Sequence, residues 1–393
     1  TFGVYEDFYK RHYLINESSS NIRYGTNADD CSWIGSAQWS LLFGLGIIAG
    51  PLLDKGYFRQ MLFLSTLIYL LSSFTLALAK ENQYYQIFLT QGLGLGLSTG
   101  LTWGPTFAVA ASHFVSHRVL AMGLVSAGSG LSGLVQTIMI NNFLNSSLGF
   151  RNTILISAGM NGGLMILANF LMSVPRNKVV VEGERRKNLS MIIPFLKELP
   201  YTLVTIGLSR IKTLLLTPGI QPTVVYIQLL SITKGLPPTF SFYSLSIVNG
   251  GTLLGRVAPN LIADRFGSYG AFNLILPGNF LLSITILAFL GVNSVAGVAV
   301  VGAIYGFFAG NFMSLCTPVL ASLAKNSSEV GARVGISTSF VGTICPIPPP
   351  ISGALLGSNF HWTAPILFSG ICSLTGACCY LAARLLVGRE ARR

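Results

Sequence analysis

One arginine inside a long apolar stretch is the residue of this sequence best suited to chemistry. Residues 240–267 read FSFYSLSIVNGGTLLGRVAPNLIADRFG, and Arg256 is the one full charge before the final pair Asp264 and Arg265. A charged side chain at membrane depth costs about 3 kcal/mol or more, so it usually faces a partner or a water-filled cavity. Two partners fit: Asp264, about two helical turns away, or the carboxylate of a bound organic anion, which accepts two parallel hydrogen bonds from a guanidinium.

The element that must hold this arginine is a membrane-spanning helix. The 393 residues are 51% hydrophobic and only 10% charged, whereas soluble domains carry about 25% charged residues. Apolar stretches of about 20 residues recur, and each is long enough to cross the ~30 Å hydrocarbon layer. The 43 glycines suit close helix packing in lipid. The composition therefore predicts an all-α polytopic membrane protein embedded in a lipid bilayer.

About twelve membrane-spanning helices are expected from the apolar stretches. The first is truncated, because the chain starts partway through it. The seventh is interrupted by Arg210 and Lys212, so that 209–222 reads either as a broken helix or as a foreign insertion. The prolines of 345–350 must kink or break the eleventh helix. The expected spans are 1–14, 33–53, 60–79, 85–114, 119–144, 153–174, 201–228, 239–263, 270–291, 295–323, 334–357 and 362–387.

The spans fall into two halves around one long polar connection. We predict a six-helix half over 1–174, a cytoplasmic linker over 175–200 and a second six-helix half over 201–393. The inner end of the second helix reads LLDKG (52–56) and that of the eighth reads LIADRFG (261–267), with an acid followed by a base in each. This repeat favours two pseudo-symmetric bundles, as in duplicated transporters.

The net charge of +12 comes mainly from basic residues in the loops between the predicted spans. Most basic residues, Arg333 among them, fall in the loops predicted to be inner, as the positive-inside rule requires. Both termini are therefore expected in the cytoplasm, with Asn16 and Asn145 outside as glycosylation acceptors. This pattern argues against a nucleic-acid partner. We expect a monomer in the plasma membrane, with the vacuolar membrane as the alternative.

Eight segments in a fixed order carry a family likeness: TFGVYEDFY, WIGSAQ (33–38), GPLLDKGYFR (50–59), GLGLGLSTGLTWGPTFAVAASHF (92–114), SHRVLAMGLVSAGSGLSG (116–133), SIVNGGTLLGRVAPNLIADRFG (246–267), YGFFAGNFMSL (305–315) and EVGARVGIS (329–337). On these segments the chain outside 201–235 resembles the monocarboxylate-transporter branch of the major facilitator superfamily, especially its fungal members. The resemblance implies a twelve-helix secondary transporter that moves a small monocarboxylate by alternating access, often together with a proton.

The resemblance also implies roles for single residues. Arg256 matches the helix-8 arginine that lines the central cavity and pairs with the substrate carboxylate. Animal members carry an acid one turn before this arginine, where the present chain has Thr252, so a coupled proton needs another site. Glu6 and Asp7 near the end of the first helix are candidates for it, with a solvated outer rim as the alternative.

Further polar residues lie within or beside the spans. Asn249, Thr252, Asn311 and Gln38 are expected to hydrogen-bond the substrate, with bonding between helices as the alternative. The resemblance implies gating ion pairs at the inner loops, rather than substrate ligands, for the residues Asp54, Lys55, Arg59, Asp264 and Arg265.

Other motifs do not hold up as active sites. GLSTG (96–100) fits a nucleophile elbow but lies inside an apolar span without the strand that this turn needs. His113 and His117 share a helical face at a predicted inner end, where an interfacial role is favoured over metal binding. We therefore expect neither an enzyme, nor a metal, nor a cofactor beyond a coupling proton. The alternatives are an exporter or importer of a larger metabolite or vitamin, a non-transporting membrane sensor, or a defective gene product.

Overall fold

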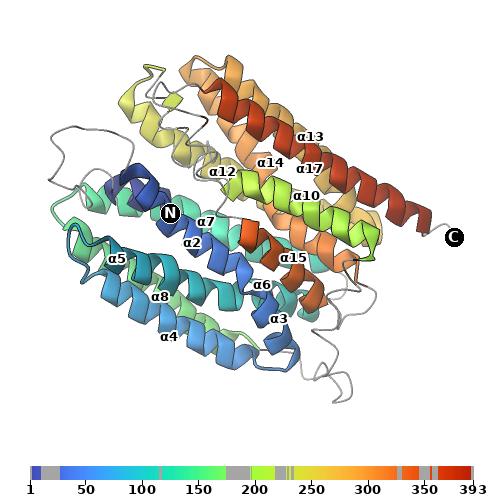
Figure 1. Ribbon diagram of the computed structural model, residues 1–393, viewed down its shortest axis with the longest axis horizontal. Coiled ribbons are helices and arrows are strands. Elements are labelled where there is room, and N and C mark those ends of the chain that lie inside the picture. Colours follow the sequence, from blue (N-terminus) through green and yellow to red (C-terminus); the bar gives the residue numbers. More distant parts are fainter. Residues whose placement is uncertain are drawn as a thin grey trace.

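The computed structural model describes residues 2–9, 27–114, 117–173, 195, 197–216, 227, 230–231, 234–324, 330–344, 355 and 362–390. Every regular element in these ranges is helical (Figure 1). The helices before the central connection, here called the early helices, are α1 (Phe2–Phe8), α2 (Asn27–Gly44), α3 (Gly46–Asp54), α4 (Phe58–Leu76), α5 (Tyr84–Ile87), η2 (Phe88–Gly94), α6 (Leu95–His113), α7 (Arg118–Leu144) and α8 (Gly149–Leu171).

The late helices follow the central connection. They are α10 (Leu199–Leu216), α12 (Pro238–Ala263), η6 (Asp264–Tyr269), α13 (Gly270–Ala288), η7 (Phe289–Gly291), α14 (Val295–Ser322), α15 (Val330–Ile344) and α17 (Thr363–Glu390). Figure 1 shows the blue and green early helices below the yellow, orange and red late helices.

Seven of the described segments are long and apolar enough to cross a membrane: Trp33–Leu53, Phe58–Leu76, Arg118–Leu144, Gly149–Leu171, Gly270–Gly291, Val295–Ser322 and Thr363–Arg389. Large apolar side chains on these helices stay exposed, including Phe63, Phe170 and Leu385. A water-soluble protein buries such side chains, whereas lipid solvates them. Length, composition and exposure thus agree with seven of the predicted membrane-spanning helices, and α12, which holds Arg256, is not among these seven.

Each set of helices has its own packing. Among the early helices, α4 packs against α6 and α8, and α2 packs against α6. Among the late helices, α14 packs against α12 and α13, and α17 packs against α10 and α13. The largest buried apolar cluster belongs mainly to the late helices and contains Tyr201, Phe272, Phe312 and Tyr380.

Two seams join the early helices to the late helices. In the first, α15 packs on α2 and α3, and we call it the α3–α15 seam. In the second, α12 packs on α7, and we call it the α7–α12 seam. The described contacts of the α7–α12 seam run from the predicted inner helix end, at Val119, to about the middle of the helices, at Gly133 and Asn249. Those of the α3–α15 seam follow almost the whole of α15, from Gly331 to Gly342.

The two irregular spans are partly described. The helix α10 continues through positions 210 and 212, so the backbone stays helical where the sequence predicts an interruption. The remainder of 209–222 beyond residue 216 lies outside the described residues, and so does the proline segment 345–350, just after the end of α15. The predicted division at 175–200 stays a prediction, because most of that segment is also outside the described residues.

Candidate functional site

The side chain of Arg256 crosses the α7–α12 seam. From α12, its Nη1 donates to the carbonyl oxygen of Ser126 at 2.8 Å and to the hydroxyl of Ser129, both on α7. The Nε atom is buried and has no hydrogen-bond partner among the described residues. The cation thus contacts neutral oxygens on one side and has an unsatisfied donor on the other.

Close helix packing brings the arginine to these serines. A Cβ atom on Gly130 of α7 would lie 3.3 Å from the Cδ of Arg256 and 3.4 Å from the Cα of Leu253. One turn further along α7, a Cβ on Gly133 would lie 4.0 Å from Oδ1 of Asn249. Since glycine has no side chain, the two backbones approach closely along this line, and Arg256 reaches across the seam.

Asp264 is not the partner of Arg256. Its Oδ1 accepts from the backbone N–H of Val119 at 3.2 Å, and its Oδ2 accepts from that of Leu120 at 3.1 Å. These N–H groups belong to the first turn of α7, which has no partners within its own helix and attracts negative charge. In the described part of the chain, Arg256 therefore has no acidic partner, and the first of its two expected partners is absent.

The expected gating residues take different positions. Lys55, Arg59 and Arg265 are exposed, and none of them forms an ion pair in the ranges that the structure describes. The side chain of Asp54 lies outside the described residues. The structure thus corrects the chemistry expected of Asp264: this residue bridges the seam by binding a helix end instead of a basic side chain. Its gating role stays a prediction.

Of the expected substrate ligands, Asn249 lies on the side of α12 that faces α7, as Arg256 does. It is half-buried, two turns before Arg256 on the same face of α12, and beside Gly133. Gln38 is half-buried on α2, where its Cα would lie 3.0 Å from a Cβ on Gly96. No hydrogen bond of either amide is described, so both retain bonding capacity.

Two other expected ligands face neighbouring helices. The hydroxyl of Thr252 donates to the carbonyl of Val248 at 2.9 Å, and its backbone packs against glycines of α14. Asn311 is only 3% exposed, and its Nδ2 donates to the carbonyl of Leu274 on α13 at 3.4 Å. The Asn311 contact agrees with the alternative of bonding between helices, whereas the Thr252 hydroxyl bonds within its own helix.

The remaining sequence candidates are at the edges of the described chain. Glu6 and Asp7 lie on α1, but their side chains are outside the described residues, as is Asn16. Asn145 follows the last residue of α7, is exposed, and donates from its amide to the carbonyl of Asn141 at 2.9 Å. The proton-site and glycosylation assignments stay predictions.

One buried cation was not expected from the sequence. Arg333, which was assigned to a predicted inner loop, lies on the first turn of α15 and is 1% exposed. Its Nη1 is 2.7 Å from the carboxylate of Glu198, and its guanidinium lies 4.5 Å from the ring centre of Phe195. Tyr201 donates to the carbonyl of Arg333 at 2.8 Å. An acid and two aromatic residues at the end of the polar connection were the available signal.

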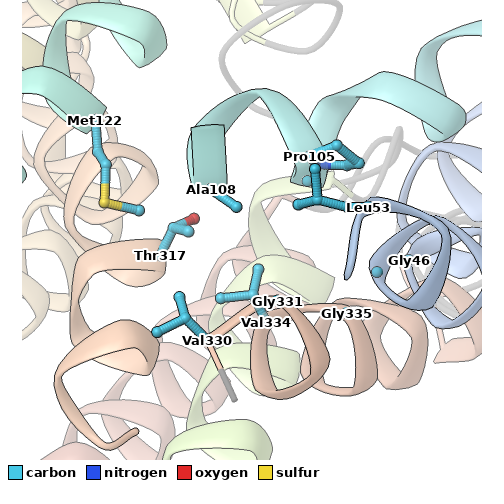
Figure 2. A pocket seen from close by; sticks show the side chains of 12 residues that line it. Gly46, Leu53, Pro105, Ala108, Met122, Thr317, Val330, Gly331, Val334 and Gly335 are labelled. Carbon is cyan, nitrogen blue, oxygen red and sulfur yellow. The ribbon is translucent and has the colours of Figure 1, made fainter. Parts of the chain in front are cut away.

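A pocket lies where the predicted inner ends of both helix sets meet (Figure 2). No charged side chain lines it, and Arg256 is not part of it. Figure 2 shows side chains from α3, α6, α7, α14 and α15 gathered around the same space. The lining residues are Gly46, Gly50, Leu53, Gly104, Pro105, Ala108, Met122, Thr317, Val330, Gly331, Val334 and Gly335. The pocket is mainly apolar and is lined by both sides of the α3–α15 seam but not by α12, so Arg256 remains the candidate for recognising charge.

The chain is similar to fungal transport proteins. It is 29% identical to the aspyridones efflux protein of Emericella nidulans over 385 residues, and this match covers 98% of this chain and 74% of that protein. It is 30% identical to an MFS-type transporter of the same species, over 95% of this chain and 79% of that protein. It is also 30% identical to the agnestins efflux protein of Paecilomyces divaricatus, over 98% of this chain and 83% of that protein.

Solved structures match the fold. The human organic anion transporter MFSD10 superposes with a TM-score of 0.66 at 15% identity, covering 98% of this chain and 89% of that chain. The Escherichia coli fucose:proton symporter gives a TM-score of 0.66 at 13% identity, covering 90% of each chain. At these identities the likeness shows the fold alone, and it confirms the predicted fold class. Because the family model described as Major Facilitator Superfamily also matches residues 21–298, the chain belongs to this superfamily of membrane transporters.

Proposed function

We propose that this chain is a secondary transporter that exports an organic anion by alternating access, and that the recognised group is a carboxylate on an apolar body. The observation that carries the proposal is the Arg256 side chain, a cation on α12, which is predicted to span the membrane, with only neutral oxygens as described partners. Unpaired charges in such a place are costly and mark substrate pathways. A bound carboxylate would supply the missing negative charge.

Arginine suits this task better than lysine would. Its planar guanidinium offers two parallel N–H groups that match the two oxygens of a carboxylate, and the pair is strongest where water is excluded. Asn249 lies on the same face of α12 and adds a free amide two turns away. The proposed site therefore contains one group for the charge and one for a polar substituent.

Alternating access requires the α7–α12 seam to part. The described contacts close the predicted inner side of this seam, where Asp264 holds the first turn of α7. An acid at a helix N-terminus contributes about 1 kcal/mol, which is small enough for a seam to open and close during transport. These contacts support an inner gate that is shut in this conformer.

The outward direction is supported by the relatives. Two of them are named efflux proteins, for aspyridones and for agnestins. Uptake of a small monocarboxylate with a proton is the narrower alternative that the sequence motifs favour, and Glu6 and Asp7 are its proposed proton sites. The proposed setting is the plasma membrane, with both termini in the cytoplasm.

Inside-out plasma-membrane vesicles from yeast that express the chain provide the test. We would measure uptake of benzoate, 1-pyrenebutyrate and 6-carboxyfluorescein, together with the uncharged amide of pyrenebutyrate. Saturable uptake of one or more anions, without uptake of the amide, is expected. Arg256→Gln should lower this flux by about 100-fold, because it removes the charge-assisted pair, and Arg256→Lys should restore only part of it. Unchanged flux in Arg256→Gln would overturn the proposed role.

A further inference from the structure

Building on the proposed anion transport, we infer that the closed inner gate holds Arg256 in an arrangement with low affinity for anions. We call this arrangement parked, and we infer that Ser129 is the residue that holds Arg256 in it. Ser129 was not among the residues expected from the sequence. It lies on α7, and its hydroxyl donates to the carbonyl of Ser126 at 2.8 Å while it accepts from Nη1 of Arg256. Ser129 therefore fixes both the position of its own hydroxyl and that of the guanidinium.

The parked guanidinium has no edge with two adjacent N–H groups available to an anion. Both hydrogens of Nη1 are used, one by the carbonyl of Ser126 and the other by the hydroxyl of Ser129. The other edge of the guanidinium needs Nε, which is buried without a partner. A carboxylate binds best to two adjacent free N–H groups. In this conformer it would find only the Nη2 atom free.

Parking depends on the state of the gate. Ser129 belongs to the early helices and Arg256 to the late helices, so their contact exists only while the α7–α12 seam is closed. When the inner gate opens, Ser126 and Ser129 move away from Nη1, and all five N–H donors of the arginine become available. The anion is thus bound tightly from the inner side and displaced by Ser126 and Ser129 when the seam closes. Displacement at that point favours release to the outer side.

The neighbouring glycine allows the parked arrangement. A Cβ on Gly130 would lie 3.3 Å from Cδ of Arg256, which is closer than about nine in ten natural Cβ contacts, so the arginine would have to shift by a few tenths of an ångström. Gly130→Ala should therefore push the arginine away from the serines without removing any polar group. Ser129→Ala removes the hydroxyl itself. These two changes weaken parking by independent routes.

The experiment uses the full chain reconstituted in liposomes, with 6-carboxyfluorescein as the probe. Affinity from each side would be measured by sided inhibition of flux. Ser132→Ala is the matched control, since Ser132 is a half-buried serine on the same helix for which no hydrogen bond is described. In Ser129→Ala and Gly130→Ala, we expect binding from the outer side to become about tenfold tighter and turnover to fall by a similar factor, as loss of a hydrogen bond to a charged group implies. Ser132→Ala should match the wild type.

A second measurement does not need transport. Hydrogen exchange of the backbone amides of Val119 and Leu120 reports whether the seam is closed, because both bind Asp264 across it. Exchange in Ser129→Ala should be several-fold faster than in the wild type and in Ser132→Ala. Equal exchange in all three proteins would overturn the parking role. If the wild type moved no probe while Ser129→Ala still exchanged faster, the proposed anion transport would fail and the parking contact would stand. Transport with unchanged outer affinity in Ser129→Ala would overturn parking and leave the transport proposal intact.

Discussion

Along the α3–α15 seam, backbones meet almost directly. A Cβ on Gly46 would lie 2.8 Å from the carbonyl of Gly335, and Ser339 bonds the backbone at Ile47 and Gly44 with distances of 2.7 and 2.9 Å. Along the α7–α12 seam, polar side chains make the crossing, with Arg256 on two serines and Asp264 on a helix end. Two seams that join the same helix sets thus differ in what holds them. Tight backbone packing suits a pivot, and a few polar contacts suit a gate that responds to charge.

The support behind the α3–α15 seam should show the largest effect on stability. Glu198 is the described acid that pairs with the buried Arg333 on α15. Glu198→Ala should lower the free energy of unfolding by about 3 kcal/mol, because it removes the carboxylate that pairs with a buried charge. Thermal unfolding in nanodiscs measures this change. Replacing both residues, as Glu198→Gln with Arg333→Met, should recover most of the loss, and a double variant no better than Glu198→Ala would contradict the account.

A side chain placed between the two backbones should block the pivot. A Cβ on Gly342 would lie 2.7 Å from the Cα of Gly44, and overpacking of this kind costs about 1–3 kcal/mol. Gly342→Val should therefore lower both probe flux and the unfolding temperature. Gly128→Ala is the control on the other seam's helix, because a Cβ there would meet nothing within 4 Å. If Gly342→Val had the probe flux and the unfolding temperature of the wild type, the distinction between pivot and gate would not hold.

Removing the charge at the gate should change its equilibrium more than the overall stability. Asp264→Asn keeps an acceptor for one N–H of α7 but loses the negative charge near the helix end, which is worth about 1 kcal/mol. The open form should become about fivefold more populated. Hydrogen exchange at Val119 and Leu120 provides the measurement, and Asp264→Glu is the charge-retaining comparison. Identical exchange in Asp264→Asn and the wild type would argue against this gate.

The smallest effect on sided affinity is expected at Ser339. Ser339→Ala removes the acceptor of the Ile47 N–H and a donor to Gly44. Each such hydrogen bond contributes about 1 kcal/mol to stability. A small decrease in unfolding temperature with unchanged sided affinity is expected. A change in the affinity from one side only would mean that this seam also senses the anion.

Much of the fold was predictable because lipid imposes simple rules. Apolar stretches of sufficient length become spanning helices, and a single charge such as Arg256 is conspicuous within one. The contacts of that charge were not predictable, since Ser129 becomes a partner only when Gly130 lets α12 approach. Asp264 was expected in an ion pair from its basic neighbours, but the orphan N–H groups of α7 come from a helix distant in sequence. Arg333 was assigned to a loop because of its charge. Its burial depends on Glu198 and on aromatic rings at the end of the polar connection, which are distant from it in sequence.

The unneutralised charge of Arg256 has an electrical consequence. Empty, the Arg256 site carries one positive charge with no described acid bound to it; loaded with a carboxylate, the site carries none. A charge that crosses the whole membrane field is worth about 2.3 kcal/mol per 100 mV. The membrane voltage should therefore act mainly on the return of the empty carrier and little on the loaded step. An inside-negative cell draws the empty carrier back toward its inner-facing form, so the resting voltage itself would speed each new cycle of export.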